Sequence, residues 1–349
     1  MSHSQGPHPS LFQFDSTFRM MLPKGSYMSP HLLGLLNSFE ENLAHSLKKL
    51  MATAKDNILS LSWMKLAMES VCETHNDIKA LIVDLELPVA EWDQEWTDVY
   101  LNNSMKLLDL CNAFSSEISR LSQGHLMLQC ALQNVDSSTA KVAAFHHFLS
   151  RWKRQISVKN PRIENCSAIM ESIIASLNLP KIKNSAKGKI LMRAMYGVKV
   201  KTLFISGIFT AAFSGSPKKL IELHVPGVLA WADTFTRLQS LVKGEIRIQF
   251  SSEGATTVLK ELAAVDALIK TLSRISQDDN INSEAFESTV SDLRNVAEQF
   301  SHELDLLSTE IDNFFHIVLA GRDTLLCSLR SNNNVSNSPK KNHAAQTVK

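Results

Sequence analysis

The chain has 349 residues, which is long enough for a sizeable core in one or two domains. Its 12 glycines and 10 prolines make up about 6% of the residues, and 44% of the residues are hydrophobic. This composition excludes a collagen-like or wholly disordered chain and argues against a turn-rich β-sandwich. The net charge of +1 gives no overall field that would attract nucleic acid, and five scattered cysteines are typical of reduced thiols inside a cell.

The two ends of the chain are predicted to lie outside the folded domain. Residues 1–28 are rich in serine and contain one acidic residue, Asp15, so they resemble a plastid transit peptide; a disordered leader is the alternative. Residues 331–349 combine asparagine, serine and lysine and are predicted to be a disordered tail. We expect an intracellular protein, with the plastid favoured over the cytosolic face of the endoplasmic reticulum or another endomembrane.

Residues 29–330 are predicted to form a single elongated helical bundle. Ser29 followed by Pro30 is a typical helix start, and Asn160 before Pro161 is a second one. Between these starts and stops, apolar residues recur at steps of three and four, the helical period. The predicted fold class is all-α: an elongated antiparallel helical bundle with long coiled-coil-like helices.

The last predicted helix has the most regular pattern. Ten apolar residues alternate steps of four and three without a polar interruption: Phe286, Val290, Leu293, Ala297, Phe300, Leu304, Leu307, Ile311, Phe314 and Val318. Such a seven-residue repeat keeps one seam facing partner helices. An intramolecular partner is favoured over a second copy because other long amphipathic helices are available, and the oligomeric state is left open.

The centre of the chain, 180–220, is basic and hydrophobic. No acidic residue lies between Glu171 and Glu222, whereas nine cations do: Lys181, Lys183, Lys187, Lys189, Arg193, Lys199, Lys201, Lys218 and Lys219. These nine residues are the candidate surface for an anionic membrane or a partner. Nucleic acid is not expected, because few aromatic residues accompany the cations.

Within this segment, residues 202–217 form a 16-residue run without charge, shorter than the roughly 20 residues that a membrane-spanning helix needs. Gly207, Ala211 and Gly215 share one helical face and allow close packing. Two interpretations remain: the innermost helix of the bundle, or a hairpin that docks on a membrane. Ser216 precedes Pro217 and is a candidate phosphosite, where a phosphate would offset the adjacent lysines.

Signatures of catalysis and of metal binding are absent or incomplete. Gly188–Lys189 lacks the other residues of a phosphate-binding loop, and His302–Glu303 lacks the second histidine of a zinc-protease motif. Cys72 and His75 are three residues apart, but without a second pair a buried thiol and a surface histidine are favoured. We therefore expect no catalytic residue, no metal site and no cofactor.

Three stretches of the sequence are distinctive: Leu179–Lys189 with Tyr196–Val198, Ser62–Pro88, and Ile317–Asp323. They resemble the plant BYPASS (BPS) family and, more distantly, the exocyst-binding ROH-like proteins. The resemblance extends over roughly residues 12–330. It implies no enzymatic activity and no cofactor. It implies a developmental role, restraint of a root-derived, carotenoid-linked mobile signal that arrests shoot and leaf growth.

The predicted function is therefore that of a non-enzymatic regulatory or adaptor protein of root and shoot development. Protein partners are expected at the helical seams, with the basic segment at an anionic membrane surface. The alternatives are an enzyme of small-molecule (apocarotenoid) metabolism with an apolar pocket between helices, and an exocyst-associated trafficking factor. A large closed cavity lined by histidine, cysteine or carboxylate side chains would favour the enzyme.

Overall fold

The computed structural model describes residues 29–53, 57–86, 94–133, 139–177, 185–251, 259–275 and 283–336. Within these ranges every regular element is a helix and there is no strand, so the predicted all-α fold class is confirmed. The predicted leader, most of the predicted tail, and two of the candidate cations, Lys181 and Lys183, lie outside the described residues.

Two predicted helix starts are observed with their caps. Helix α2 (Pro30–Ala52) begins after Ser29, whose side-chain oxygen accepts a hydrogen bond from the Leu32 N–H at 3.3 Å. Helix α6 (Pro161–Ile174) begins after Asn160, which caps its first turn in the same way. The other elements are α3 (Leu61–Asp84), α4 (Gln94–Gln133), α5 (Thr139–Ser157), α7 (Ala186–Ser214), the 3-10 turn η2 (Pro217–Lys219), α8 (Ala232–Ser251), α9 (Lys260–Ile275) and α10 (Ser283–Ser336).

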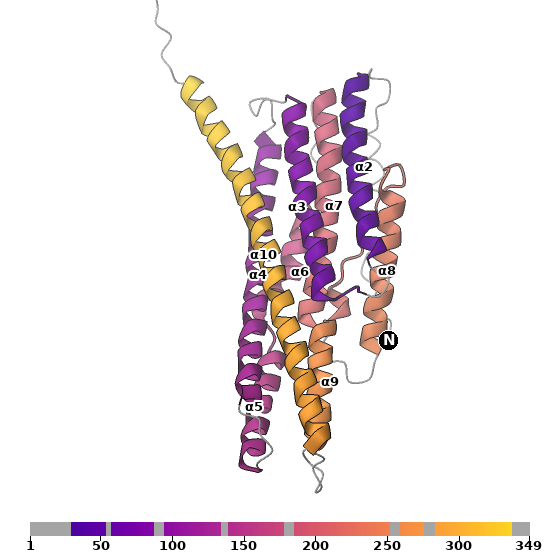
Figure 1. The fold of residues 1–349 in the computed structure, drawn as a ribbon. Coiled ribbons are helices and arrows are strands. Elements are labelled where there is room, and N and C mark those ends of the chain that lie inside the picture. Colours follow the sequence, from indigo (N-terminus) through magenta and orange to yellow (C-terminus); the bar gives the residue numbers. More distant parts are fainter. Residues whose placement is uncertain are drawn as a thin grey trace, which may run out of the picture.

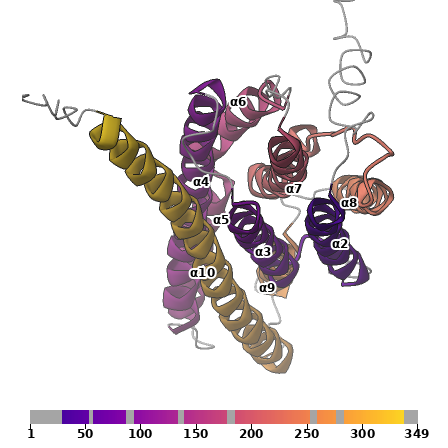
Figure 2. The same cartoon turned by 90° about the horizontal axis from the view of Figure 1, so that it is seen from above.

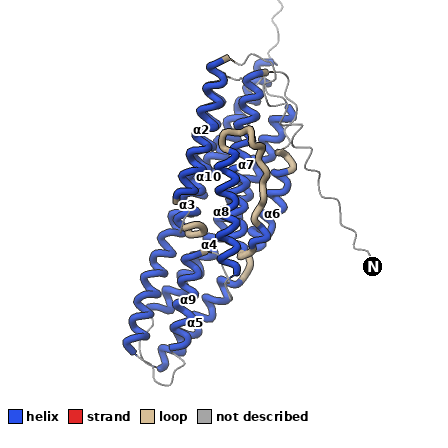
Figure 3. Tube along the Cα trace, turned by 90° about the vertical axis from the view of Figure 1, so that its right-hand side faces the viewer, coloured by secondary structure: helices blue, strands red, loops and turns tan. Residues whose placement is uncertain are grey.

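The long helices lie side by side along one direction, which makes the molecule elongated (Figure 1). Helices α2, α3, α7 and α8 lie toward the upper end of that view, and α5 and α9 lie toward the lower end beside α4 and α10. Seen from above, α7 lies between α6 and the group formed by α2, α3 and α8 (Figure 2). The connection from α7 to α8 runs back along the bundle as an extended loop (Figure 3).

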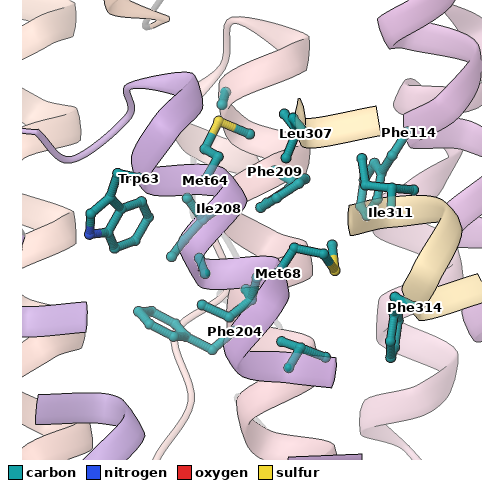
Figure 4. Packing of buried hydrophobic residues seen from close by; sticks show 14 of the residues in the cluster. Trp63, Met64, Met68, Phe114, Phe204, Ile208, Phe209, Leu307, Ile311 and Phe314 are labelled. Carbon is teal, nitrogen blue, oxygen red and sulfur yellow. The ribbon is translucent and has the colours of Figure 1, made fainter. Parts of the chain in front are cut away.

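The core is built around α7, which contacts α2, α3, α4 and α6. Its side chains are buried on all sides from Val200 to Ala212. A helix that is apolar all round belongs in the interior of a protein or in a membrane. Here Phe204, Ile208 and Phe209 lie among Met64 and Met68 of α3, Phe114 of α4, and Leu307, Ile311 and Phe314 of α10 (Figure 4).

The seam predicted for the last helix is buried within the same chain. All ten of its apolar residues are part of the core, and α10 contacts α3, α4 and α9. The favoured intramolecular partner is therefore observed. At about 1.5 Å per residue, the 54 residues of α10 extend over roughly 80 Å. This length lets α10 contact helices at both ends of the bundle.

Candidate functional site

The predicted basic segment is the central helix of the bundle rather than a surface hairpin. Helix α7 is the one described helix that is long and apolar enough, by length and composition, to cross a membrane, and 83% of its most apolar window is buried inside the protein. Residues 202–212 are buried without exception. Of the two interpretations of residues 202–217, the structure therefore favours the innermost helix over the membrane hairpin.

A small residue on α7 explains how the returning loop comes so close. A Cβ at Gly207 would lie 3.4 Å from the backbone nitrogen of Ile221, which is an ordinary van der Waals contact, so the loop lies close enough to meet a side chain larger than that of alanine. The loop also contacts α8, because Gln239 exchanges two hydrogen bonds with the backbone of Leu223. The predicted face of small residues thus accommodates a segment of this chain.

Lys201 is not a surface charge, and this corrects the expectation drawn from the sequence. It is 1% exposed, and its nitrogen donates to Ser46 Oγ at 2.7 Å, to the Ser70 carbonyl at 2.7 Å and to Thr74 Oγ1 at 2.8 Å. All three ammonium protons are therefore used. Burial disfavours the charged form and lowers the pKa of Lys201 to about 7.

Arg193 is also committed within the fold. Its Nε and Nη2 donate to the two oxygens of Glu40 at 2.5 and 2.9 Å, and Glu40 is itself buried. The Ala230 N–H donates to the same carboxylate at 3.3 Å. This group fastens α2, α7 and the start of α8 to one another. The charge of Arg193 is therefore neutralised by Glu40 within the fold, so Arg193 does not contribute to a basic surface for a membrane or partner.

Lys199 lies beside a small cavity between α3, α4, α6, α7 and α10. Its nitrogen donates to the Ser176 carbonyl at 3.2 Å, and burial lowers its pKa to about 8. His75 lines the same cavity, where its Nε2 lies 3.0 Å from Thr202 Oγ1 and its ring lies against Phe314. His75 is thus half-buried and partly inside the fold, where the sequence had favoured a surface position, and burial lowers its pKa to about 3.

The remaining described cations of the candidate surface are dispersed. Lys187 is half-buried and donates to the Glu86 carbonyl, Lys189 is half-buried, and Lys218 is exposed at η2. Lys219 forms an ion pair with Glu164 at 3.3 Å. The seven described members of the set thus do not form one continuous face.

Ser216 lies at the turn that follows α7. The turn begins at Gly215, whose φ of 62° is the left-handed conformation that glycine adopts without strain. The Ser216 side chain is half-buried, and its backbone carbonyl accepts from the Lys219 N–H at 3.1 Å. A phosphate at Ser216 would compete with Glu164 for Lys219. Phosphorylation stays a prediction.

The described residues contain no group of three or more side chains that could hold a metal ion. Cys72, Cys111 and Cys166 are buried, and burial raises their thiol pKa values, to about 12 for Cys72 and about 11 for Cys166. Thiols of this kind are inert at neutral pH. The cavity beside His75 has a volume of about 70 Å³, room for about two water molecules.

Sequence reasoning missed the cavity and the Glu40–Arg193 pair. The sequence nevertheless contained a signal that Lys201 is buried, because Lys201 falls on the same helical face as the apolar residues Val198 and Ile205, three and four residues away. No comparable signal marks Glu40, which lies in α2 and meets Arg193 across 153 positions of the sequence.

Comparison with known proteins adds the family. The family model described as Protein BPS1 matches residues 75–326. The chain belongs to the BPS1 family. "Protein BPS1, chloroplastic" of Arabidopsis thaliana is 52% identical over 332 residues, which cover 95% of this chain and 94% of that protein. "UPF0496 protein 4" of Oryza sativa, in the indica and japonica subspecies alike, is 42% identical over 317 residues, covering 89% of this chain and 68% of the rice protein.

Membership of the BPS1 family confirms the resemblance to BYPASS proteins that the three sequence stretches indicated. It supports the coarser part of the functional expectation, a regulatory protein of plant development. No solved structure matches the chain.

Proposed function

We propose that this BPS1-family protein is a non-enzymatic regulator or adaptor of plant root and shoot development. In this role it restrains the production of a root-derived, carotenoid-linked mobile signal that arrests shoot and leaf growth. Family membership supports the developmental part of the proposal. The observation that carries the non-enzymatic part is the position of α7, which fills the space between the helices where a catalytic pocket would otherwise lie.

Two further features favour binding over catalysis. The cavity that holds His75, Tyr100 and Lys199 is far smaller than the roughly 300–1,000 Å³ of typical substrate pockets, and a larger groove beside α5 has neither histidine nor cysteine in its lining. The most perturbed cation, Lys201, is fully hydrogen-bonded in the core, so it has no free path to a substrate. The buried polar groups around α7 thus hold helices together.

A rescue experiment tests the non-enzymatic proposal. Roots lacking their own BPS1-family protein would express either this chain or a triple variant, His75→Gln, Tyr100→Phe and Lys199→Met. These substitutions remove three of the four ionisable groups that line the cavity, leave Lys79 in place, and keep the cavity's shape. Wild-type shoots grafted on both kinds of root should grow equally well.

The matched control is Phe204→Asp, which places a charge in the core and should abolish rescue by unfolding the bundle. Loss of rescue by a cavity triple variant that retains the wild-type melting temperature would contradict the proposal and favour the enzyme alternative.

We place the protein in the plastid, because the Arabidopsis relative is named chloroplastic and residues 1–28 resemble a transit peptide. Residues 1–28 fused to a fluorescent protein should enter plastids, and the full chain without them should not. A full chain that locates to the endoplasmic reticulum, with or without these residues, would favour the endomembrane alternative.

Partner proteins and anionic membranes remain proposed ligands of the outer surface. Flotation with anionic and neutral liposomes, at low and high salt, tests for electrostatic docking, which should require anionic lipid and weaken at high salt. The exposed Lys218 and its neighbour Lys219 are the described residues to neutralise first. Binding that ignores lipid charge and salt would discard electrostatic docking. Recovery of exocyst subunits from root extract would support the trafficking alternative.

A further inference from the structure

A groove of the described structure lies at the end of α7. It has a volume of about 570 Å³ and is open to solvent on one side. Its walls come from α4, the end of α5 with the turn after it, the start of α6, and α9 as far as Lys270. Its upper end is formed by the end of α7 and the glycine that follows, Ala212–Gly215. The volume lies within the roughly 300–1,000 Å³ of pockets that hold small organic molecules.

The lining of the groove includes apolar side chains that water can reach. Ile156 of α5 and Phe213 of α7 are half-buried, and Val158 is 55% exposed although it is a large apolar residue. Beneath them, Leu121 and Ile163 belong to the core. An apolar molecule in the groove would remove this surface from water, which favours its binding.

Three cations on the rim lack a carboxylate partner among the described residues. They are Lys153 and Arg154 of α5 and Lys159 of the turn that follows, and all three are exposed. The other cations of the lining are already paired: Arg120 with Glu117 at 2.6 Å and Lys270 with Asp266 at 2.7 Å. Glu164 also lines the groove, where it is paired with Lys219 from outside the lining, so the five cations and three carboxylates of the lining leave a net charge of +2 beside an apolar surface.

The wall that carries these cations is held in place. Arg120 of α4 donates to Glu117 and to the backbone carbonyls of Gln155 and Ile156 at the end of α5. The Asn160 side chain donates to the same Glu117 at 3.1 Å. This network fixes the turn between α5 and α6 against α4, so the rim is formed before any ligand arrives.

The charge of the two ends of this chain does not complement the rim of the groove. Residues 1–28 contain a single acidic residue, Asp15, and residues 337–349 contain none, whereas both contain lysine or arginine. Their charge matches that of the rim and is repelled by it. A folded protein partner would bury a far larger area, about 800 Å² on each side, than a groove of this volume offers.

From the apolar lining, the three unpaired cations and the fixed wall, we infer that this groove binds small amphipathic organic anions. The apolar body of such a molecule lies against Phe213, Ile156 and Val158, and its carboxylate or other acidic group lies among Lys153, Arg154 and Lys159. This inference does not depend on the proposed developmental role.

The test uses 8-anilinonaphthalene-1-sulfonate, a fluorescent aromatic anion, with the full chain. Trp152 lines the groove, and its excitation energy should pass to the bound probe. Replacing Trp152 by Phe should remove most of this transfer while leaving the affinity within about threefold, because its indole N–H has no hydrogen-bond partner among the described residues. Octanoate and octanol then compete for the site, since they share a chain and differ in charge.

Octanoate should displace the probe at a concentration at least tenfold lower than octanol. In a variant with Lys153→Gln, Arg154→Gln and Lys159→Gln, this preference should fall below threefold. A control variant with Lys218→Gln, Lys243→Gln and Arg247→Gln, which neutralises the rim of a different groove, should keep it. Because all three substituted rim residues are exposed, the variant should keep the wild-type melting temperature.

Equal displacement by octanoate and octanol would overturn the inference, as would an equal loss of preference in the control variant. Probe binding that is unaffected by Trp152→Phe in both affinity and energy transfer would place the anion site elsewhere. Val158→Asp gives an independent check, because a carboxylate at this exposed position should weaken probe binding at least tenfold.

Discussion

At the upper end of the bundle, α7 occupies the space enclosed by α2, α3 and α6, whereas at the lower end α4, α5, α9 and α10 surround no comparable helix among the described residues (Figure 1). The two ends also differ in the hydrogen bonding of their buried basic side chains. Lys201 of α7 has three acceptors, and His125 of α4 has no hydrogen-bond partner in the described structure. Helix α7 brings Lys201 within reach of hydroxyl and carbonyl groups of α2 and α3, whereas the lower end has an open groove and, separately, a buried histidine without a partner among the described residues.

The contrast between a filled upper end and an open groove would be wrong if Phe209 and Phe213 of α7 contributed equally to stability. Phe209 is fully buried with its ring 5.3 Å from that of Phe114, whereas Phe213 is half-buried at the groove. Phe209→Ala should lower the free energy of unfolding by about 3–5 kcal/mol. Phe213→Ala should cost about 1–2 kcal/mol, because part of its surface already meets water. Urea denaturation of both variants measures the difference.

Glu40 should be the next most sensitive position. Glu40→Gln leaves the Arg193 guanidinium without its buried counter-charge and should cost about 3 kcal/mol. The matched control is Glu222→Gln, which interrupts an exposed pair with Lys243 and should stay within about 1 kcal/mol. Chemical denaturation in both variants checks the ranking, and equal costs would mean that the Glu40 pair is as exposed as the control.

Lys201 should give the upper end a pH-dependent stability. Its pKa is about 7 when folded and near 10.5 when unfolded, so between these values the unfolded chain binds more protons. The Lys201 contribution to stability should therefore rise with pH over this window, by up to about 1.4 kcal/mol per pH unit. Lys199 adds to this rise, and the buried thiols of Cys72, Cys111 and Cys166 oppose it. The quantity to follow is therefore the free energy of unfolding of the wild type minus that of Lys201→Met, which should increase between pH 7.5 and 9.5 in urea denaturation. A variant with the wild-type pH dependence would show that Lys201 is hydrated.

His125 should give the smallest effect and the opposite sign. Burial lowers its pKa, and neither ring nitrogen has a hydrogen-bond partner in the described structure. His125→Leu removes the cost of these unsatisfied groups and should stabilise the protein by about 1 kcal/mol at pH 7. Below pH 6.5 the gain should grow, because the unfolded chain binds a proton that the folded state disfavours. Thermal melting of the wild type and the variant at pH 7 and pH 5.5 measures the stabilisation and its increase at lower pH. A variant that melts below the wild type at pH 7 would contradict the inference that His125 is buried without hydrogen-bond partners.

The elements of this fold were largely readable from the sequence because their signals are local. The caps at Ser29 and Asn160 and the unbroken repeat from Phe286 to Val318 depend on residues a few positions apart. Helix α7 was harder, since an apolar run with flanking lysines is equally typical of a core helix and a membrane segment. Only the surrounding helices decide between them.

The sites depended on long-range geometry and could not be predicted. Lys201 finds its acceptors on α2 and α3, more than 120 positions away in the sequence. The groove exists because α7 ends at Ser214, level with the end of α5 and the start of α9. The spacing of apolar residues along the sequence does not indicate where three separate helices end relative to one another in space.

Hydrogen–deuterium exchange of the full chain tests most directly whether α7 is the inner helix of this bundle. Peptides covering residues 200–212 should exchange more slowly than all others that the described residues supply. Peptides at the end of α5 and the start of α9, beside the groove, should exchange at least tenfold faster. Exchange of residues 200–212 at the rate of those two segments would contradict the account.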